Sequence, residues 1–131
     1  MGFFDKFKSA PDLAKEEIIE TPWHVLGKME QLDELVEQSK TKPVAIFKHS
    51  TRCGISRGVL KMFEKNYKLN DNQLKLYFLD LLQNRDISNE IAARFKVPHE
   101  SPQMIVIKNG IVVHNDSHHS IEAAHLERFA D

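Results

Sequence analysis

The sequence predicts an α/β domain with a central mixed β-sheet of four to five strands flanked by helices. Three observations lead to this fold class. Short apolar segments alternate with segments whose apolar residues recur at helical spacing. Two of the apolar segments, 44–47 and 76–82, are apolar enough to be buried on both faces, as central strands are. Near the end of the chain, Asn109 and Gly110 separate two β-rich runs, which predicts a hairpin.

The elements are expected in the order β-α-β-α-β-α-β-β-α. The first half of the chain predicts a short strand at 23–26, a helix at 28–38, the buried strand from Val44 and a helix from about 54 to 67. Apolar residues recur every three or four positions in both helices, and Pro43 separates the first helix from the buried strand.

The second half continues with the strand at 76–82 and a short helix around Ile91. That helix is expected to end before Pro98, because the residue preceding a proline avoids helical backbone angles. The Asn-Gly hairpin follows, and a last helix is predicted from about Ser120. Strands that alternate with helices and end in a hairpin indicate a mixed sheet with helices on both faces.

Composition sets the domain plan and excludes several classes of protein. The chain has 131 residues, 41% of them hydrophobic, and a formal net charge of −1. We expect one globular domain at 21–131, preceded by an N-terminal extension at 1–20. Near-neutral charge gives no basic surface for nucleic acid, and the apolar runs are too short to span a membrane. The start does not resemble a secretory signal, so we expect a cytoplasmic protein without nucleic-acid or membrane partners.

The only cysteine, Cys53, directly follows the buried strand and precedes the next helix. A helix N-terminus beyond the carboxyl end of a central strand is a common place for a site in α/β sheets. Unpaired backbone N–H groups, the helix dipole, Arg52 and Arg57 all favour the thiolate over the thiol. A buried, inert cysteine is the alternative, but the polar stretch HSTRCG is unlike a core sequence.

Ser56 stands where a C-x-x-C site would have its second cysteine. Its hydroxyl could donate a hydrogen bond to the Cys53 thiolate, or it could satisfy backbone donors at the helix start. His49 lies four residues before Cys53 and could either tune the thiolate or pack at the strand end. Pro102 precedes the first hairpin strand, and we expect its peptide bond to be cis and to face Cys53.

Histidines also raise the question of a metal site. His114, His118 and His119 fall close together, with His125 six residues further on. Zinc sites need a third ligand and suitable geometry in addition to such a pair. Solvated loop histidines are the more common case, so no metal site is predicted.

From about Trp23 to its end, the chain resembles thioredoxin-fold proteins and, among them, the monothiol bacilliredoxins of the YtxJ type. FKHSTRCGIS resembles the strand-to-site segment of that family, and SPQMIVIKNG resembles its proline loop and hairpin. The usual family site reads Thr-Cys-Pro-Ile-Ser, and here Arg52 replaces the threonine and Gly54 the proline. The resemblance implies Cys53 as catalytic residue, supported by Ser56, Arg52, Arg57, Gly54, Ser101 and Pro102.

The resemblance also implies the chemistry. Cys53 would remove a low-molecular-weight thiol, bacillithiol, from mixed disulfides on client proteins, with that thiol as co-substrate and no bound cofactor. Ser56 cannot expel the adduct, because a hydroxyl is not a comparable nucleophile at neutral pH. Two alternatives stay open. CGISRGVL also resembles the Cys-Gly-x-Ser-Arg site of glutaredoxin-type arsenate reductases, and the fold could serve as a binding module without turnover.

Overall fold

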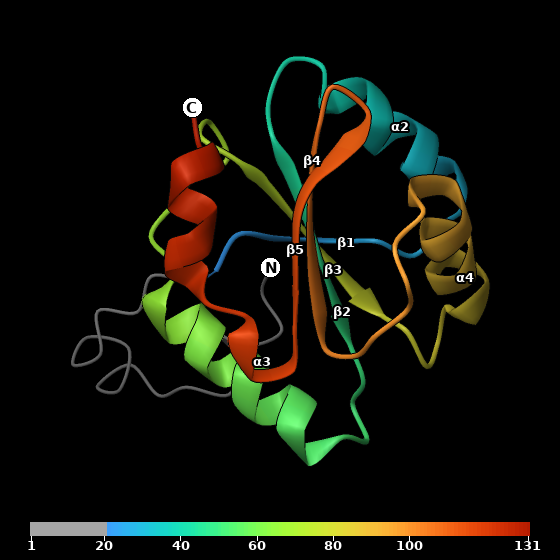
Figure 1. Ribbon diagram of the computed structural model, residues 1–131, viewed down its shortest axis with the longest axis vertical. Helices are drawn as coiled ribbons and strands as arrows, with labels where there is room; N and C mark the ends of the chain where they lie inside the picture. The colour runs from blue at the N-terminus through green and yellow to red at the C-terminus, as the bar shows by residue number, and fades with distance from the viewer. Residues whose placement is uncertain (1–20) are drawn as a thin grey trace, which may run out of the picture.

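A five-stranded mixed sheet runs through the centre of the protein, with helices on both faces (Figure 1). The computed structural model describes residues 21–131, so the extension expected at 1–20 lies outside the described residues. The strand order is β1-β3-β2-β4-β5. These strands are β1 (Trp23–Val25), β2 (Val44–His49), β3 (Lys75–Asp80), β4 (Gln103–Lys108) and β5 (Ile111–Ser117).

Strand β2 lies in the middle of the sheet. It runs parallel to β3 and antiparallel to β4, while β1 extends the parallel side and β5 the antiparallel side. All six residues of β2 are buried, which confirms the prediction of a central strand from Val44. Because parallel neighbours share their direction, β2 and β3 end at the same edge of the sheet, where β4 begins.

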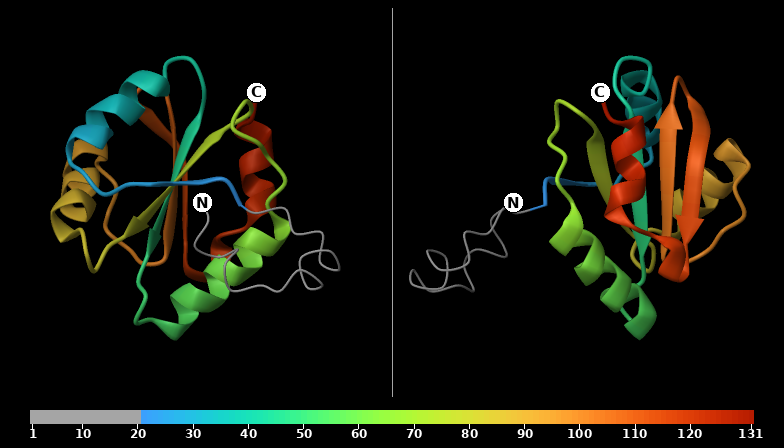
Figure 2. Two further views of the ribbon diagram at one scale, coloured as in Figure 1. Left: turned by 180° about the vertical axis from the view of Figure 1, so that it is seen from behind. Right: turned by 60° about the vertical axis from the view of Figure 1, so that its left-hand side comes forward.

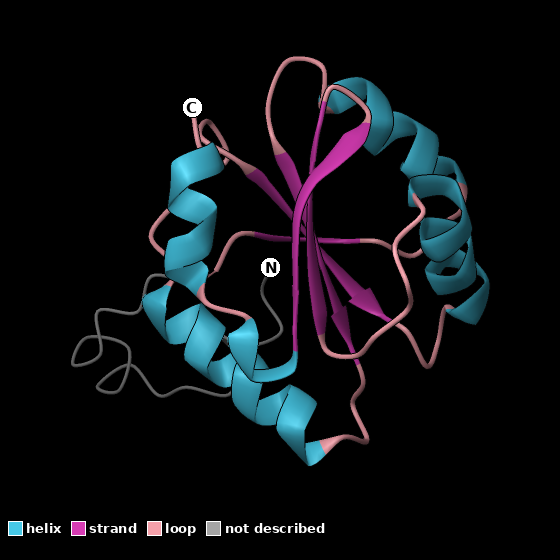
Figure 3. Cartoon of the chain, viewed as in Figure 1, coloured by secondary structure: helices cyan, strands magenta, loops and turns pink. Residues whose placement is uncertain are grey.

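The helices divide between the two faces of the sheet (Figures 2 and 3). Their bounds are α2 (Glu30–Gln38), α3 (Gly54–Asn66), α4 (Arg85–Phe95) and the 3-10 helices η2 (His118–Ser120) and η3 (Ala123–Phe129). Apolar residues of α2 and α4 form one buried cluster, and those of α3 and η3 form the other. No helix within residues 21–131 is long and apolar enough to cross a membrane.

The alternation along β2 supplies both clusters. Val44 and Ile46 face α2 and α4, whereas Ala45 and Phe47 face α3 and η3. Successive side chains of a strand point to opposite faces, so the same alternation sends Lys48 and His49 to different sides. The polar end of β2 therefore contributes one titratable side chain to each face.

Two elements differ from the sequence prediction. Strand β3 ends at Asp80, two residues earlier than expected, because the Asp80 carboxylate accepts a hydrogen bond from the Leu82 N–H at 3.1 Å and starts a turn. The expected last helix is two 3-10 segments separated by Ile121, which is extended and buried in the core. The buried, extended Ile121 interrupts the single helix that was expected from about Ser120.

The hairpin agrees with its Asn-Gly signal. Asn109 and Gly110 have φ of 54° and 78°, as a two-residue turn with both central residues in the left-handed region requires. The turn is tied to the end of α2, because the Gly110 N–H donates to Ser39 Oγ at 2.8 Å. The contact anchors the turn end of the hairpin, where Lys108 pairs with Ile111.

Candidate functional site

Cys53 lies at the N-terminus of α3, in the turn that leaves the carboxyl end of β2. Its backbone is extended and its carbonyl accepts the first helical hydrogen bond, from the Arg57 N–H at 3.0 Å. The side chain is half-buried, and the first turn of α3 contains no acidic residue. The cysteine thus occupies the positive end of a 13-residue helix, as the sequence predicted.

Positive charge lies beside the cysteine at the protein surface. Arg52 and Arg57 are both exposed, and the Arg57 guanidinium donates to the Thr51 carbonyl at 3.0 Å. Gly54 is exposed too, and a side chain there would meet only Arg57 Nη2, at an ordinary contact distance of 3.8 Å. The replacement of the family's proline by Gly54 is therefore not required by close packing.

Ser56 is fully buried beneath this turn. Its hydroxyl oxygen accepts a hydrogen bond from the Ser50 N–H at 3.1 Å and lies 2.8 Å from His49 Nδ1. Desolvation by burial lowers the pKa of His49; the Arg57 charge acts in the same direction and Asp80 acts against it. A neutral His49 can accept the hydroxyl proton at Nδ1, so Ser56 has both its donor and its acceptor satisfied.

This arrangement favours the second of the two roles considered for Ser56. The hydroxyl joins the turn to the end of β2, and none of its hydrogen bonds in the described part of the chain reaches Cys53. The sequence had left open whether His49 tunes the thiolate or packs at the strand end, and the structure places it against Ser56. The signal was present in the alternation of β2, which places His49 on the same face as Phe47 and hence under α3.

Lys48 occupies the opposite face and is fully buried. Its ammonium group lies 3.1 Å from His99 Nδ1, and Ser88 Oγ lies 3.3 Å from the same nitrogen. Burial lowers the pKa of Lys48 to about 8. Within residues 21–131 no carboxylate forms an ion pair with it. A buried amine whose partner is an imidazole is an expensive group to hold in a protein core.

The proline loop reaches the same edge of the sheet as Cys53 (Figure 1). The Ser101–Pro102 peptide bond is cis, as predicted. Gln103 pairs with Lys48, so Pro102 lies one position beyond the last paired residue, at the carboxyl end of β2. The Pro102 carbonyl accepts a hydrogen bond from the His118 N–H at 3.0 Å, and the buried Ser101 hydroxyl has no hydrogen-bond partner in the part of the chain that the structure describes.

A groove of about 740 Å³ begins beside the cysteine and runs between α3 and the C-terminal segment. Gly54 and Ile55 lie at its start, and Met62 lines it further along α3. Ile55 is 50% and Met62 58% exposed, so apolar surface is open to solvent next to Cys53. Such a groove offers a contact surface to a molecule that reacts at the thiol.

Comparison with known proteins assigns the family. A family model described as monothiol bacilliredoxin BrxC matches residues 24–126. The chain belongs to the monothiol bacilliredoxin family. The resemblance carried by FKHSTRCGIS and SPQMIVIKNG is thereby confirmed. Membership, together with the thioredoxin fold, supports a thiol redox function for this bacilliredoxin.

Solved structures agree with the fold. A thioredoxin-fold protein described as a candidate oxidoreductase is 33% identical, covers 82% of this chain and 92% of its own, and superposes with a TM-score of 0.70. The thioredoxin of Malassezia sympodialis is 18% identical, with coverages of 84% and 88% and a TM-score of 0.64. Fasciola hepatica thioredoxin is 23% identical, with coverages of 81% and 95% and a TM-score of 0.62. These two thioredoxins support the fold of this bacilliredoxin.

Proposed function

We propose that the protein is a cytoplasmic monothiol oxidoreductase whose Cys53 removes bacillithiol from mixed disulfides on client proteins. The observation that carries the proposal is the position of the only cysteine. It stands at the N-terminus of α3, at the same sheet edge as a cis-proline loop, in a member of the monothiol bacilliredoxin family. Family membership supports the choice of bacillithiol as the small thiol.

The proposed reaction proceeds in two thiol–disulfide exchanges. The Cys53 thiolate attacks the small-thiol sulfur of the mixed disulfide, a new disulfide forms on Cys53, and the client sulfur leaves as a thiolate. A second small thiol, as its thiolate, then attacks the adduct, forms the symmetric small-thiol disulfide and releases the Cys53 thiolate. The incoming small thiol is oxidised and the sulfur of the client is reduced, while the transferred small thiol remains at the disulfide level throughout.

The buried position of Ser56 supports an external thiol for the second exchange. Its hydroxyl is engaged by His49 and Ser50 and is closed off from solvent. The adduct on Cys53 must therefore wait for a thiol from solution. Arg52, Arg57 and the N-terminus of α3 place positive charge where the thiolate forms and is released.

The groove along α3 supports a role in holding the client. It starts at Gly54, directly after the reactive residue, and carries exposed apolar side chains. A client whose modified cysteine reaches Cys53 would contact Ile55 first. The binding-module alternative uses the same surface without turnover, so measuring turnover separates the two readings.

The test uses the full chain and a client protein modified in parallel with bacillithiol, glutathione or coenzyme A. Intact masses of both proteins are followed over time. We expect release of the bacillithiol-modified client together with a bacillithiol adduct on Cys53, and slower reaction with the other two thiols. Release of the client while the wild-type protein never carries the adduct would refute the mechanism. A failure of every modified client to react would favour the binding module.

A matched variant tests the external-thiol step. Ser56→Cys restores a C-x-x-C site, and its thiol lies one helical turn from Cys53. We expect this variant to expel the adduct and to end with an internal disulfide, two hydrogens lighter than the reduced protein. An adduct that persists on the variant as long as on the wild type would show that position 56 cannot reach Cys53.

A further inference from the structure

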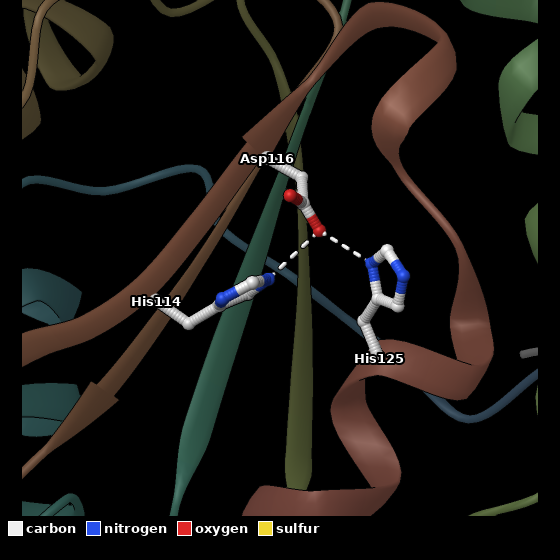
Figure 4. Close-up of side chains that lie close together, drawn as sticks. All are labelled: His114, Asp116 and His125. Atoms are coloured by element: carbon white, nitrogen blue, oxygen red, sulfur yellow. Dashed lines mark hydrogen bonds and ion pairs between the residues drawn. The ribbon is translucent and has the colours of Figure 1, made fainter.

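A cluster of two histidines and one aspartate lies on the face of β5 that η3 covers (Figure 4). His114 and Asp116 come from β5, and His125 comes from η3. The Asp116 carboxylate oxygen Oδ2 lies 2.8 Å from His114 Nε2 and 2.9 Å from His125 Nδ1. The three side chains thus converge on one point, well away in sequence from the residues of the thiol site.

A β-bulge accounts for the convergence. Val112 pairs with Ile107, whereas His114 pairs with Val106, so Val113 is an extra residue in β5. Without it, Val112 and His114 would point to the same face of the sheet. The bulge lets Val112 pack against the α2–α4 core while His114 turns towards η3. Both histidines can then reach Asp116.

We propose that His114, Asp116 and His125 form a binding site for one Zn²⁺ ion. Their ligand atoms all lie within 4.8 Å of one another. Tetrahedral zinc with bonds of about 2.0–2.2 Å separates its ligand atoms by about 3.3 Å, so the carboxylate must move slightly away from both imidazoles and the side chains must rotate to admit the ion. Two imidazole nitrogens and one carboxylate oxygen suit Zn²⁺ rather than Mg²⁺ or Ca²⁺, which prefer oxygen ligands.

The surroundings supply further features of a three-ligand site. Asp116 and His114 are mostly covered, while the His125 side chain is 40% exposed and leaves a path for a water molecule as fourth ligand. Glu122 Oε2 lies 3.8 Å from His125 Nε2, the ring nitrogen that faces away from Asp116. A carboxylate in that position orients a ligating histidine and holds the proton on its outer nitrogen.

Arg128 opposes the metal and so provides a test. Its Nη2 lies 3.0 Å from His114 Nδ1 and donates to it, which keeps the His114 proton on Nε2, towards Asp116. Binding of zinc at Nε2 requires this proton to move to Nδ1 and the exposed Arg128 side chain to swing away. Loss of the Arg128 side chain should therefore raise the affinity for zinc.

Two other histidines of this region, His118 and His119, lie outside the cluster. His118 lies 3.4 Å from Glu100, and His119 lines the groove along α3, so neither belongs to the cluster. Of the four histidines considered from their sequence spacing, the fold brings His114 and His125 together and leaves the other two apart. The zinc site does not depend on the thiol chemistry proposed above, and either can be wrong without the other.

The experiment is a calorimetric titration of the chelator-treated, untagged full chain with Zn²⁺. The Cys53→Ala variant is titrated in parallel to remove the thiol as a ligand. We expect one ion per chain in both proteins. Asp116→Asn and His125→Gln should each weaken binding at least about tenfold, whereas His119→Gln should not change it. Absence of binding to the Cys53→Ala variant, or unchanged affinity in both ligand variants, would overturn the proposal.

Arg128→Ala provides a second test, which still applies if removing a ligand unfolds the protein. This variant retains all three ligands, and circular dichroism establishes that it is folded. We expect its affinity for Zn²⁺ to rise several-fold. Cobalt titration of the same variant in the Cys53→Ala background should give the visible absorption of a tetrahedral ion. Unchanged or weaker zinc binding in Arg128→Ala would show that His114 Nε2 is not a ligand.

Discussion

Two adjacent residues at the end of β2, His49 and Lys48, lie on opposite faces of the sheet and differ in how their charge is handled. His49 faces α3, where burial keeps the pKa of its ring low and Ser56 bonds to it at 2.8 Å. Lys48 faces α4 and is also inaccessible to solvent, and its ammonium group lies 3.1 Å from His99 Nδ1, which Ser88 Oγ approaches to 3.3 Å. Among residues 21–131, one face thus holds a satisfied neutral pair and the other holds a cation that forms no ion pair with a carboxylate.

The two faces differ in where they carry positive charge, and this location determines whether a residue affects thiol transfer or the stability of the fold. On the α3 face, the polar groups beneath the Cys53 turn are neutral and paired, and the positive charges of Arg52 and Arg57 lie outside, in solvent. On the α4 face, the charge is inside, next to Gln103 and the proline loop. We infer that changes to the exposed residues around Cys53 alter thiol transfer, and that changes to the buried polar groups of either face alter the free energy of unfolding.

The largest effect should follow from removing the thiol. Cys53→Ala is expected to lose all transfer of the small thiol, because the sequence offers no other cysteine. Its free energy of unfolding should change by less than about 0.5 kcal/mol, since the side chain is half-buried and makes no capping hydrogen bond. Transfer is followed by intact mass and stability by urea unfolding. Any residual transfer above the rate without protein would contradict the assignment of Cys53.

On the other face, Lys48→Met should stabilise the protein without affecting the thiol. The pKa of Lys48 falls from 10.5 to about 8, which corresponds to a cost of up to about 3 kcal/mol at pH 7. Methionine fills a similar volume and carries no charge. Urea unfolding should show this gain, while the exposed Lys61→Met on α3 should show almost none. A less stable Lys48→Met protein would mean that the contact with His99 outweighs the burial of the charge.

The same residue predicts a dependence on pH. Below pH 8, Lys48 is protonated in both the folded and the unfolded state, so its full cost is present. Between pH 8 and 10.5 the folded protein has lost this proton and the unfolded chain still binds it, so stability rises with pH. The advantage of Lys48→Met over the wild type should therefore be largest at pH 7 and shrink towards pH 10. A constant difference would show that charge is not its cause.

Ser56→Ala tests the satisfied face and should have an effect of opposite sign that does not exceed that of Lys48→Met. The substitution leaves the Ser50 N–H and His49 Nδ1 without their buried partner, which costs about 1–3 kcal/mol. Ser88→Ala is the matched control on the α4 face, where the hydroxyl is 3.3 Å from its partner and should matter less. Both are measured by urea unfolding. A Ser56→Ala protein as stable as the wild type would show that the bond to His49 is not important for the fold.

Much of this comparison could be anticipated from the sequence, because it rests on local patterns. The Asn109-Gly110 turn and the buried strand from Val44 follow from residue type and alternation alone. Alternation also assigns Lys48 and His49 to opposite faces. The cis bond before Pro102 needed the family resemblance as well, because an X-Pro dipeptide by itself is usually trans.

Contacts between distant elements could not be anticipated. The partner of Ser56 depends on how α3 returns over the end of β2, and the partner of Lys48 comes from a loop 51 residues further along the chain. The cluster of His114, Asp116 and His125 requires both a bulge in β5 and a C-terminal segment whose helical type the sequence did not reveal. Periodicity predicts which face a residue occupies within its element, and only the packing of elements selects its neighbours.

The smallest effect should come from Arg57, whose charge is exposed to solvent, whereas the charge of Lys48 is buried. Arg57→Ala removes one exposed cation next to Cys53 and one hydrogen bond to Thr51, so transfer should slow by about two- to fivefold, in line with the roughly 0.2–1 kcal/mol of an exposed charge interaction. High salt should reduce the difference in transfer rate between wild type and variant, because the Debye length shortens to about 3 Å at 1 M salt. Lys61→Ala, one turn further along α3, is the control.

The arsenate reductase alternative requires Arg57 to hold the oxyanion. It therefore predicts that Arg57→Ala abolishes arsenate-dependent turnover and that arsenate protects the wild-type Cys53 from alkylation. We expect neither effect, since the guanidinium is already bonded to the backbone of the turn, and protection by arsenate would reverse the choice between the two chemistries.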